Sequence, residues 1–287
     1  MERQQFLVIY RELLTMQRPP ESPNVVFSDF WIVLTYLWAV IWNRPVSWAC
    51  AKENWPPDFE WYTPPHPATM SRRLKTPAVH TLLTLVFNRF NDRLPQSGFK
   101  HFDGKPLTVG GYSKDPEAAC GRAAGFLARG YKLHCIWDAT GHIEGWEITS
   151  LNVSEVEVAK ILIPKVVEPS FIITDGQNDT NELYDLAGEY HHQWLAGKRR
   201  KKAKGLGHQY QSILRLRALR MINDGVGGPL LHARDDIERR FGSLGNCPEG
   251  LTPLPNWVRR LHRVHLWIQG KFILYLQRIT EKHRLAA

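Results

Sequence analysis

The chain has 287 residues, of which 43% are hydrophobic and 23% are charged, a globular composition that excludes disordered and fibrous proteins. Its net charge is +9, and residues 191–287 hold 19 of the 37 Lys and Arg but only 6 of the 28 Asp and Glu. Positive charge concentrated in one part of a chain indicates a polyanionic partner, either nucleic acid or an anionic membrane surface. The four cysteines form no Cys-x-x-Cys pair and residues 1–5 open no secretory signal, so we expect a cytoplasmic protein with reduced thiols.

Residues 1–95 are predicted to form a helical N-terminal domain. The run FWIVLTYLWAVIW at 30–42 has 13 residues without a charge. A membrane span needs about 20 such residues, so we expect a buried core helix and no membrane contact. The segment PATMSRRL at 67–74 begins with small and polar residues and continues through Arg72 and Arg73. It is typical either of a helix that enters the DNA major groove or of a solvated helix end.

The periodicity changes from helix to strand after residue 95. Residues 131–137 and 143–151 flank a turn at 138–141 and predict a hairpin. Further strands and helices are predicted at 99–103, 154–163, 171–174, 181–190, 192–196 and 256–278. This order predicts an α/β domain over 96–287, in which helices flank a mixed sheet and one helix ends the chain.

Three carboxylates stand at informative positions. Asp103 and Asp175 each end a predicted strand and precede a glycine, and ligands of open α/β sheets bind at strand ends. Glu238 adjoins the apolar side of a further predicted helix. Converging carboxylates offer the hard oxygen ligands that Mg²⁺ prefers, and two such ions promote phosphodiester cleavage. Spacing alone also fits unrelated surface acids, since the chain has 28 Asp and Glu.

Basic residues accompany these carboxylates in the sequence. The flanking cations that would offset phosphate charge are Lys105, Arg234, Arg239 and Arg240. The tract KRRKKAK at 198–204 is either a solvated, localisation-like loop or a phosphate-contacting loop. Its predicted phosphate contacts are Lys198, Arg199, Arg200, Lys201 and Lys202. Two other acids have plainer explanations: turn formation accounts for Asp138, and Asp179 either approaches Asp175 or caps the next helix.

In three blocks the chain resembles the DDE transposases of bacterial insertion sequences, the group with a Tyr-x-x-Arg-x-x-x-Glu-x6-Lys signature. The blocks are HFDGKPL at 101–107, FIITDGQNDTNELYDLA at 171–187 and HARDDIERRFGSLGN at 232–246. Between the first two, the predicted hairpin and helix match the RNase H-like core of that family. The resemblance covers about residues 99–280 and implies an RNase H-like catalytic domain.

The resemblance also implies an activity and its machinery. Asp103, Asp175 and Glu238 match the catalytic, metal-binding triad, with Mg²⁺ as cofactor and Mn²⁺ as a substitute. The implied reactions are cleavage at the element ends and strand transfer into target DNA. The implied partners are double-stranded DNA, as terminal inverted repeats and target, and a second copy of the chain in a homodimeric synaptic complex. Arg234 matches the signature arginine that helps to hold DNA, and a nucleoid-associated location in the bacterial cytoplasm follows.

Three positions depart from the family pattern. Leu231 replaces the signature tyrosine and Gly245 replaces the signature lysine, which removes two DNA contacts. Asn178 stands where relatives often have an aromatic residue. Two alternatives therefore stay open: a catalytically decayed or repurposed DNA-binding protein, and an RNase H-like nuclease without joining activity.

Overall fold

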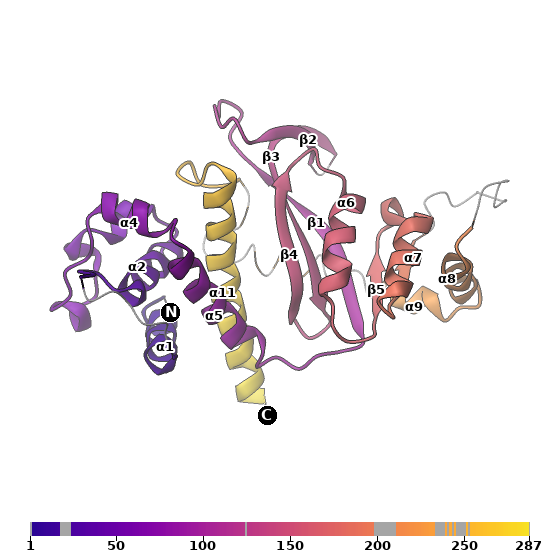
Figure 1. The fold of residues 1–287 in the computed structure, drawn as a ribbon, viewed down its shortest axis with the longest axis horizontal. Helices are drawn as coiled ribbons and strands as arrows, with labels where there is room; N and C mark the ends of the chain where they lie inside the picture. Colours follow the sequence, from indigo (N-terminus) through magenta and orange to yellow (C-terminus); the bar gives the residue numbers. More distant parts are fainter. Residues whose placement is uncertain are drawn as a thin grey trace. The chain divides into compact units, whose positions relative to one another are not determined.

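A computed structural model describes residues 2–17, 24–123, 125–197, 211–232, 239, 241–242, 244, 251 and 253–286. The chain divides into two compact units, whose helices and strands are labelled in Figure 1. The helical unit comprises Met1–Leu94, Leu244–Leu251 and His262–Ala287. The sheet unit comprises Pro95–Ser243 and Thr252–Leu261.

The helical unit contains N-terminal helices and one C-terminal helix. Its described elements are α1 (Glu2–Thr15), α2 (Asp29–Ile41), α3 (Val46–Ala49), η1 (Lys52–Asn54), η2 (Pro57–Phe59), α4 (Pro67–Arg73), α5 (Pro77–Asn91) and α11 (Leu261–Ala286). Proline opens both α4 and α5, where its missing N–H would have no intrahelical acceptor. Local sequence therefore sets where these two helices begin.

The uncharged run predicted as a core helix forms α2. Eleven of the 13 residues of α2 are buried. The ring of Phe6 in α1 lies 4.6 Å from that of Trp38, in a tilted contact typical of aromatic cores. The prediction of a buried core helix is confirmed. Among the residues that the structure describes, no helix is both long and apolar enough to cross a membrane.

The C-terminal helix α11 belongs to the helical unit. At Gly270 a Cβ atom would lie 3.1 Å from Cγ2 of Val40, so the missing side chain lets α11 approach α2 closely. Phe272 meets Phe87 of α5 edge to face, with the ring centroids 6.1 Å apart. The sequence prediction assigned this helix to the domain over 96–287, whereas its apolar stripe completes the core of the N-terminal helices. Periodicity marked the buried side of α11 but did not say which partner covers it.

The sheet unit contains a six-stranded mixed sheet. Its strands are β1 (Phe99–Thr108), β2 (Ala119–Ala123), β3 (Phe126–Asp138), β4 (Ile143–Ser150), β5 (Phe171–Thr174) and β6 (Gln193–Ala196). β3 pairs antiparallel with β1, β2 and β4, whereas β5 pairs parallel with β1 and β6. Three antiparallel strands followed by two parallel ones make the sheet RNase H-like, as predicted, and the short β2 is an addition that the sequence did not predict.

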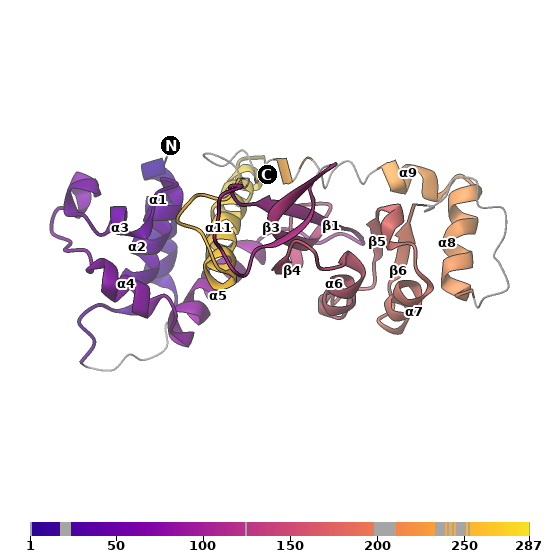
Figure 2. The same cartoon turned by 90° about the horizontal axis from the view of Figure 1, so that it is seen from above.

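Helices flank this sheet. They are α6 (Glu155–Leu162), η3 (Ile163–Lys165), η4 (Gly176–Asn178), α7 (Asn181–Glu189), α8 (Ile213–Asn223) and α9 (Gly227–His232). Figure 2 shows α6 and α7 on one side of β5 and β6, with α9 on the other. The core on the α6 side includes Phe102, Ile136, Leu162, Tyr184 and Trp194, all fully buried. These residues form the apolar core between the sheet and α6.

Candidate metal centre on the sheet

Asp103 lies half-buried in the middle of β1. The strand continues to Thr108 instead of ending at Asp103 as predicted, because its ladder with β3 extends that far. The Gly104 N–H donates to Oδ1 of Asp103 at 2.8 Å and orients the carboxylate. Since Phe102 points into the core under α6 and side chains alternate along a strand, Asp103 points to the opposite face.

The close approach of Glu155 explains why a glycine follows Asp103. A Cβ atom there would lie 2.7 Å from Oε1 of Glu155. That oxygen accepts from Nζ of Lys132 at 3.2 Å, in an ion pair that is 14–16% exposed. The Lys132–Glu155 ion pair therefore lies on the α6 side of β1, on the face opposite the Asp103 carboxylate.

Asp175 follows the last residue of β5 and is half-buried. Its Oδ1 accepts from the Gln177 N–H at 2.9 Å, which caps the 3-10 helix η4. The same oxygen accepts from Nδ2 of Asn178 at 3.1 Å. Two donors from the following turn therefore hold one oxygen of the Asp175 carboxylate.

The register of β1 and β5 brings the two aspartates together. Phe99 pairs with Phe171 and His101 with Ile173 in a parallel ladder. The ladder ends at His101 and Ile173, and the same offset, continued by two residues, would set Asp103 opposite Asp175, the residue that follows β5. Neighbouring strands lie about 4.8 Å apart, and residues in register on parallel strands point to the same face. Two carboxylates thus share one face of the sheet at the same level.

The donor set of this pair suits a hard divalent cation. Carboxylate oxygens are the ligands that Mg²⁺ binds in proteins, and it keeps water or phosphate in its other positions. Among the described residues, no group of three or more His, Cys, Asp or Glu forms a metal cluster. Glu238, the predicted third carboxylate, lies outside the described residues.

Phe241 identifies the chain segment that covers this face. Its ring, which is buried, meets Trp137 edge to face at 5.6 Å. Trp137 pairs with His101 in the antiparallel ladder, and paired residues point to the same face. His101 and Asp103 are two residues apart and share that face. The chain at Phe241 therefore lies over the side of the sheet that carries the two aspartates.

The predicted DNA-contacting residues fare differently. Lys105 is two residues beyond Asp103 in β1 and therefore points to the same face. Arg239 is exposed. The remaining predicted contacts of the sheet unit lie outside the described residues; they are Arg234, Arg240, Lys198, Arg199, Arg200, Lys201 and Lys202.

The two arginines of α4 have separate environments. Arg72 is exposed at the end of the helix. Arg73 donates to the Phe27 carbonyl at 2.9 Å and to Oδ1 of Asp29 at 2.7 Å. Arg73 does not fit the predicted DNA contact, because its guanidinium ties α4 to the start of α2. Only Arg72 retains the exposure that the prediction requires.

Leu231 and Asn178 show what the departures from the family pattern do here. Leu231 is partly buried and packs against the apolar core of the sheet unit. Asn178 is buried, and its Nδ2 donates both to Asp175 and to Oγ1 of Thr174, the latter at 2.9 Å. The sequence analysis noted Asn178 only as a departure from the family pattern and did not predict that it orients the Asp175 carboxylate.

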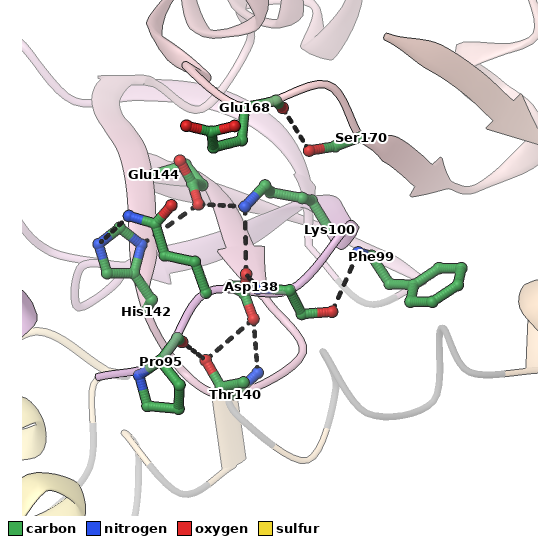
Figure 3. A network of polar contacts seen from close by, with 11 residues as sticks. Pro95, Phe99, Lys100, Asp138, Thr140, His142, Glu144, Glu168 and Ser170 are labelled. Atoms are coloured by element: carbon green, nitrogen blue, oxygen red, sulfur yellow. Dashed lines mark hydrogen bonds and ion pairs between the residues drawn. The ribbon is translucent and has the colours of Figure 1, made fainter.

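Asp138 belongs to a buried network on the α6 side of the sheet (Figure 3). Its Oδ1 accepts from the Thr140 N–H at 2.7 Å, which confirms the predicted role in the turn. Its Oδ2 also accepts from Nζ of Lys100 at 3.1 Å, and Lys100 pairs with Glu144 as well. Lys100 and Asp138 are completely buried. The network fixes β1 to the β3–β4 hairpin and so supports the strand that carries Asp103.

The Asp179 carboxylate pairs with a distant arginine and does not cap α7. Its two oxygens accept from Nε and an Nη of Arg215 in α8, at 2.7 and 2.9 Å. The N-cap of α7 is Thr180. The predicted capping role of Asp179 is therefore wrong, because a side chain distant in sequence binds its carboxylate in a bidentate pair.

Comparisons with known proteins place the chain only at the level of shape. No protein-family model matches it, and no curated protein matches its sequence. A solved structure described as a piggyBac transposase synaptic complex with hairpin DNA superposes with a TM-score of 0.49 at 10% sequence identity. The match covers 99% of this chain and 73% of that one. At this score the likeness carries no argument about activity, which rests on the site itself.

Proposed function

We propose that the chain is a DNA transposase that cuts DNA at the ends of a mobile element and joins them to target DNA. The observation that carries the proposal is the parallel register of β1 and β5 in an RNase H-like sheet, whose continuation sets Asp103 opposite Asp175. The blocks that resemble DDE transposases include both residues. The excess of basic residues in 191–287 supports a polyanionic substrate.

In this proposal Asp103, Asp175 and Glu238 hold Mg²⁺, for which Mn²⁺ can substitute. When bound, the metal supplies Lewis-acid activation of the scissile phosphate and of the attacking oxygen. The Gly104 N–H orients one carboxylate, and Asn178 with the Gln177 N–H orients the other. A fixed pair of carboxylates lowers the cost of organising the site before the reaction.

Both proposed steps are in-line phosphoryl transfers, first to water and then to the freed 3′-OH. Such steps need positioning and charge compensation more than a covalent nucleophile. Lys105 faces the same side as the carboxylates and offsets phosphate charge. Arg234, Arg239, Arg240 and the tract at 198–202 extend the grip along DNA. The helical unit, with Arg72 exposed, reads the terminal inverted repeats, and two copies of the chain hold two ends.

The proposal is tested with a supercoiled plasmid that carries the DNA flanking the gene. Purified protein is incubated with it in Mg²⁺ or Mn²⁺, beside Asp175→Ala and the exposed control Asp224→Ala. Breaks are mapped at nucleotide resolution and joined products are sequenced. Breaks at inverted repeats and joined ends, both lost only in Asp175→Ala, are expected. Metal-dependent breaks that persist in Asp175→Ala would refute the assignment.

A second candidate is a DNA-binding protein that has lost catalysis. The packing of Leu231 into the core favours it, because the signature tyrosine would contact DNA from that position. Specific binding to the flanking DNA without cleavage in either metal would select this candidate. Cleavage without any joined product would instead select an RNase H-like nuclease.

A further inference from the structure

A second concave site lies in the sheet unit, away from the two aspartates. It is a cavity of about 600 Å³ between the β1–β2 connection and the segment that precedes α11. Gly110, Tyr112 and Lys114 line one wall, and Asn256, Arg259 and Arg260 line the other. The roles proposed above use none of these residues.

Asp115 ties the two walls together. Its Oδ2 accepts from the Arg260 N–H at 2.9 Å and from the hydroxyl of Tyr131 in β3 at 2.7 Å. Its Oδ1 accepts from the Glu117 N–H at 3.2 Å. Burial alone would raise the pKa of Asp115, but these hydrogen bonds outweigh it and lower the pKa below its usual value. An ionised, buried carboxylate thus holds both walls in place, so the cavity is formed before any ligand arrives.

The cations at the rim differ in what they are free to bind. The Arg259 guanidinium donates to the carbonyls of Pro255 and Val258 at 2.6 and 2.8 Å, so it braces its own loop. Lys114 and Arg260 are exposed, and neither has an ion-pair partner among the described residues. Arg260 has φ of +69°, a left-handed conformation that is uncommon outside glycine. Its hydrogen bond to Asp115 maintains that conformation, which sets where its side chain leaves the backbone.

Tyr112 gives the cavity an aromatic rim. Its side chain is fully exposed, with a relative accessibility of 102%. This fully exposed ring, on the loop that also carries Lys114, has no role in the core. Such a combination of a π-face and phosphate-binding cations is the pattern by which proteins bind unpaired nucleotides.

We propose that this cavity binds an unpaired segment of a DNA strand, with a base stacked on Tyr112 and the adjoining phosphates at Lys114 and Arg260. The choice of DNA as ligand rests on the proposed function. Asp103 and Val109 are six residues apart along a continuous strand, which is about 20 Å. This span corresponds to about six base pairs of duplex. In this proposal, the DNA end cut at the aspartates extends to the cavity, and its unpaired strand is what the cavity binds.

The test is equilibrium binding of the full chain to fluorescein-labelled DNA without divalent metal, so that cleavage plays no part. Two DNAs are compared, a blunt duplex and the same duplex with a single-stranded 3′ extension of about ten nucleotides. The variants are Tyr112→Ala, Tyr112→Phe and the double variant Lys114→Gln/Arg260→Gln, with the exposed Lys52→Gln as the matched control.

Tyr112→Ala is expected to weaken binding of the extended DNA about 5- to 150-fold, the range for losing one base–aromatic stack, and to leave the blunt duplex unchanged. Tyr112→Phe keeps the wild-type affinity. The double variant lowers the slope of log affinity against log salt by about 1.4, as for two lost single-strand phosphate contacts. Lys52→Gln has a smaller effect on both DNAs than the double variant.

Three results would overturn the proposal. If wild type binds DNA and the cavity variants match Lys52→Gln, the cavity is not a DNA site, and the proposed function is untouched. If Tyr112→Ala weakens both DNAs equally, the stacking assignment is wrong. Absence of any DNA binding by wild type would refute the proposed function together with this inference.

Discussion

Replacement of Lys100 by methionine tests whether the buried network holds β1 in place. The Lys100 ammonium lies between the carboxylates of Asp138 and Glu144, and all three side chains are 0–5% exposed. Methionine preserves most of the volume but removes the only lysine of the network. Two carboxylates then stay buried without their cation. Breaking a buried ion pair in this way costs about 3–5 kcal/mol.

The loss is expected in the sheet unit alone. For a unit of this size, each kcal/mol lowers the melting temperature by about 2–4 °C, so a drop of about 6–20 °C follows. Hydrogen exchange of the β1 and β3 amides measures the free energy of opening in this unit without interference from the helical unit. Lys165→Met is the control, because its ion pair with Glu147 is 45% and 36% exposed and solvent screens it.

The difference in stability between wild type and Lys100→Met should depend on pH. Burial alone would raise the pKa of Glu144, but hydrogen bonds from His142 and Lys100 outweigh it and lower the pKa below its usual 4.5. Ionised Glu144 therefore stabilises the wild-type fold above about pH 4.5, and this contribution is lost as the pH falls through the folded-state pKa. Lys100→Met lacks the part of this contribution that Lys100 supplies, while His142 remains, so the difference between the two proteins narrows on acidification. A loss below about 1 kcal/mol at pH 7, or a gap that widens in acid, would refute the reasoning.

Three further outcomes follow from the same geometry. Gly130→Ala should destabilise the β1–β3 pairing by about 1–3 kcal/mol in chemical denaturation, because its Cβ atom would lie 2.2 Å from the Leu107 carbonyl oxygen. Gly98→Ala is the control, since a Cβ atom there meets nothing within 4 Å. Equal stability of the two variants would contradict this prediction. Asn178→Ala should slow DNA cleavage more than it weakens DNA binding, because Asp175 loses a hydrogen bond; an unchanged rate in a folded variant counts against the positioning role. Asp175→Cys should lose cleavage in Mg²⁺ and recover part of it in Mn²⁺, since a thiolate is a poor ligand for the harder ion; equal rates in both metals would mean that residue 175 is not a ligand.

The sequence predicted the elements that depend on local pattern. Alternation located the β3–β4 hairpin, and an apolar run followed by Asp-Gly located Asp175 at the end of β5. The sheet class followed from the order of strands and helices. These features persist in the structure because neighbouring residues alone determine them.

Features that depend on residues distant in the chain could not be predicted from the sequence. The parallel register that sets Asp103 opposite Asp175 joins segments 72 residues apart, and nothing local specifies it. Arg215 forms an ion pair with Asp179, 36 residues earlier in the chain, and Arg73 forms one with Asp29, 44 residues earlier. Asp179 and Arg73 were predicted to have other roles because the sequence did not reveal that each side chain forms an ion pair with a residue distant in the chain.

Titration of Mn²⁺ followed by electron paramagnetic resonance tests most directly whether Asp103 and Asp175 bind one divalent cation between them. The proteins compared are wild type, Asp103→Asn, Asp175→Asn and the exposed control Asp224→Asn. We expect wild type and Asp224→Asn to bind Mn²⁺ with the same affinity. Asp103→Asn and Asp175→Asn should each bind Mn²⁺ at least about tenfold more weakly, which is equivalent to about 1.4 kcal/mol of binding free energy. Wild-type Mn²⁺ binding in both Asp103→Asn and Asp175→Asn would contradict it.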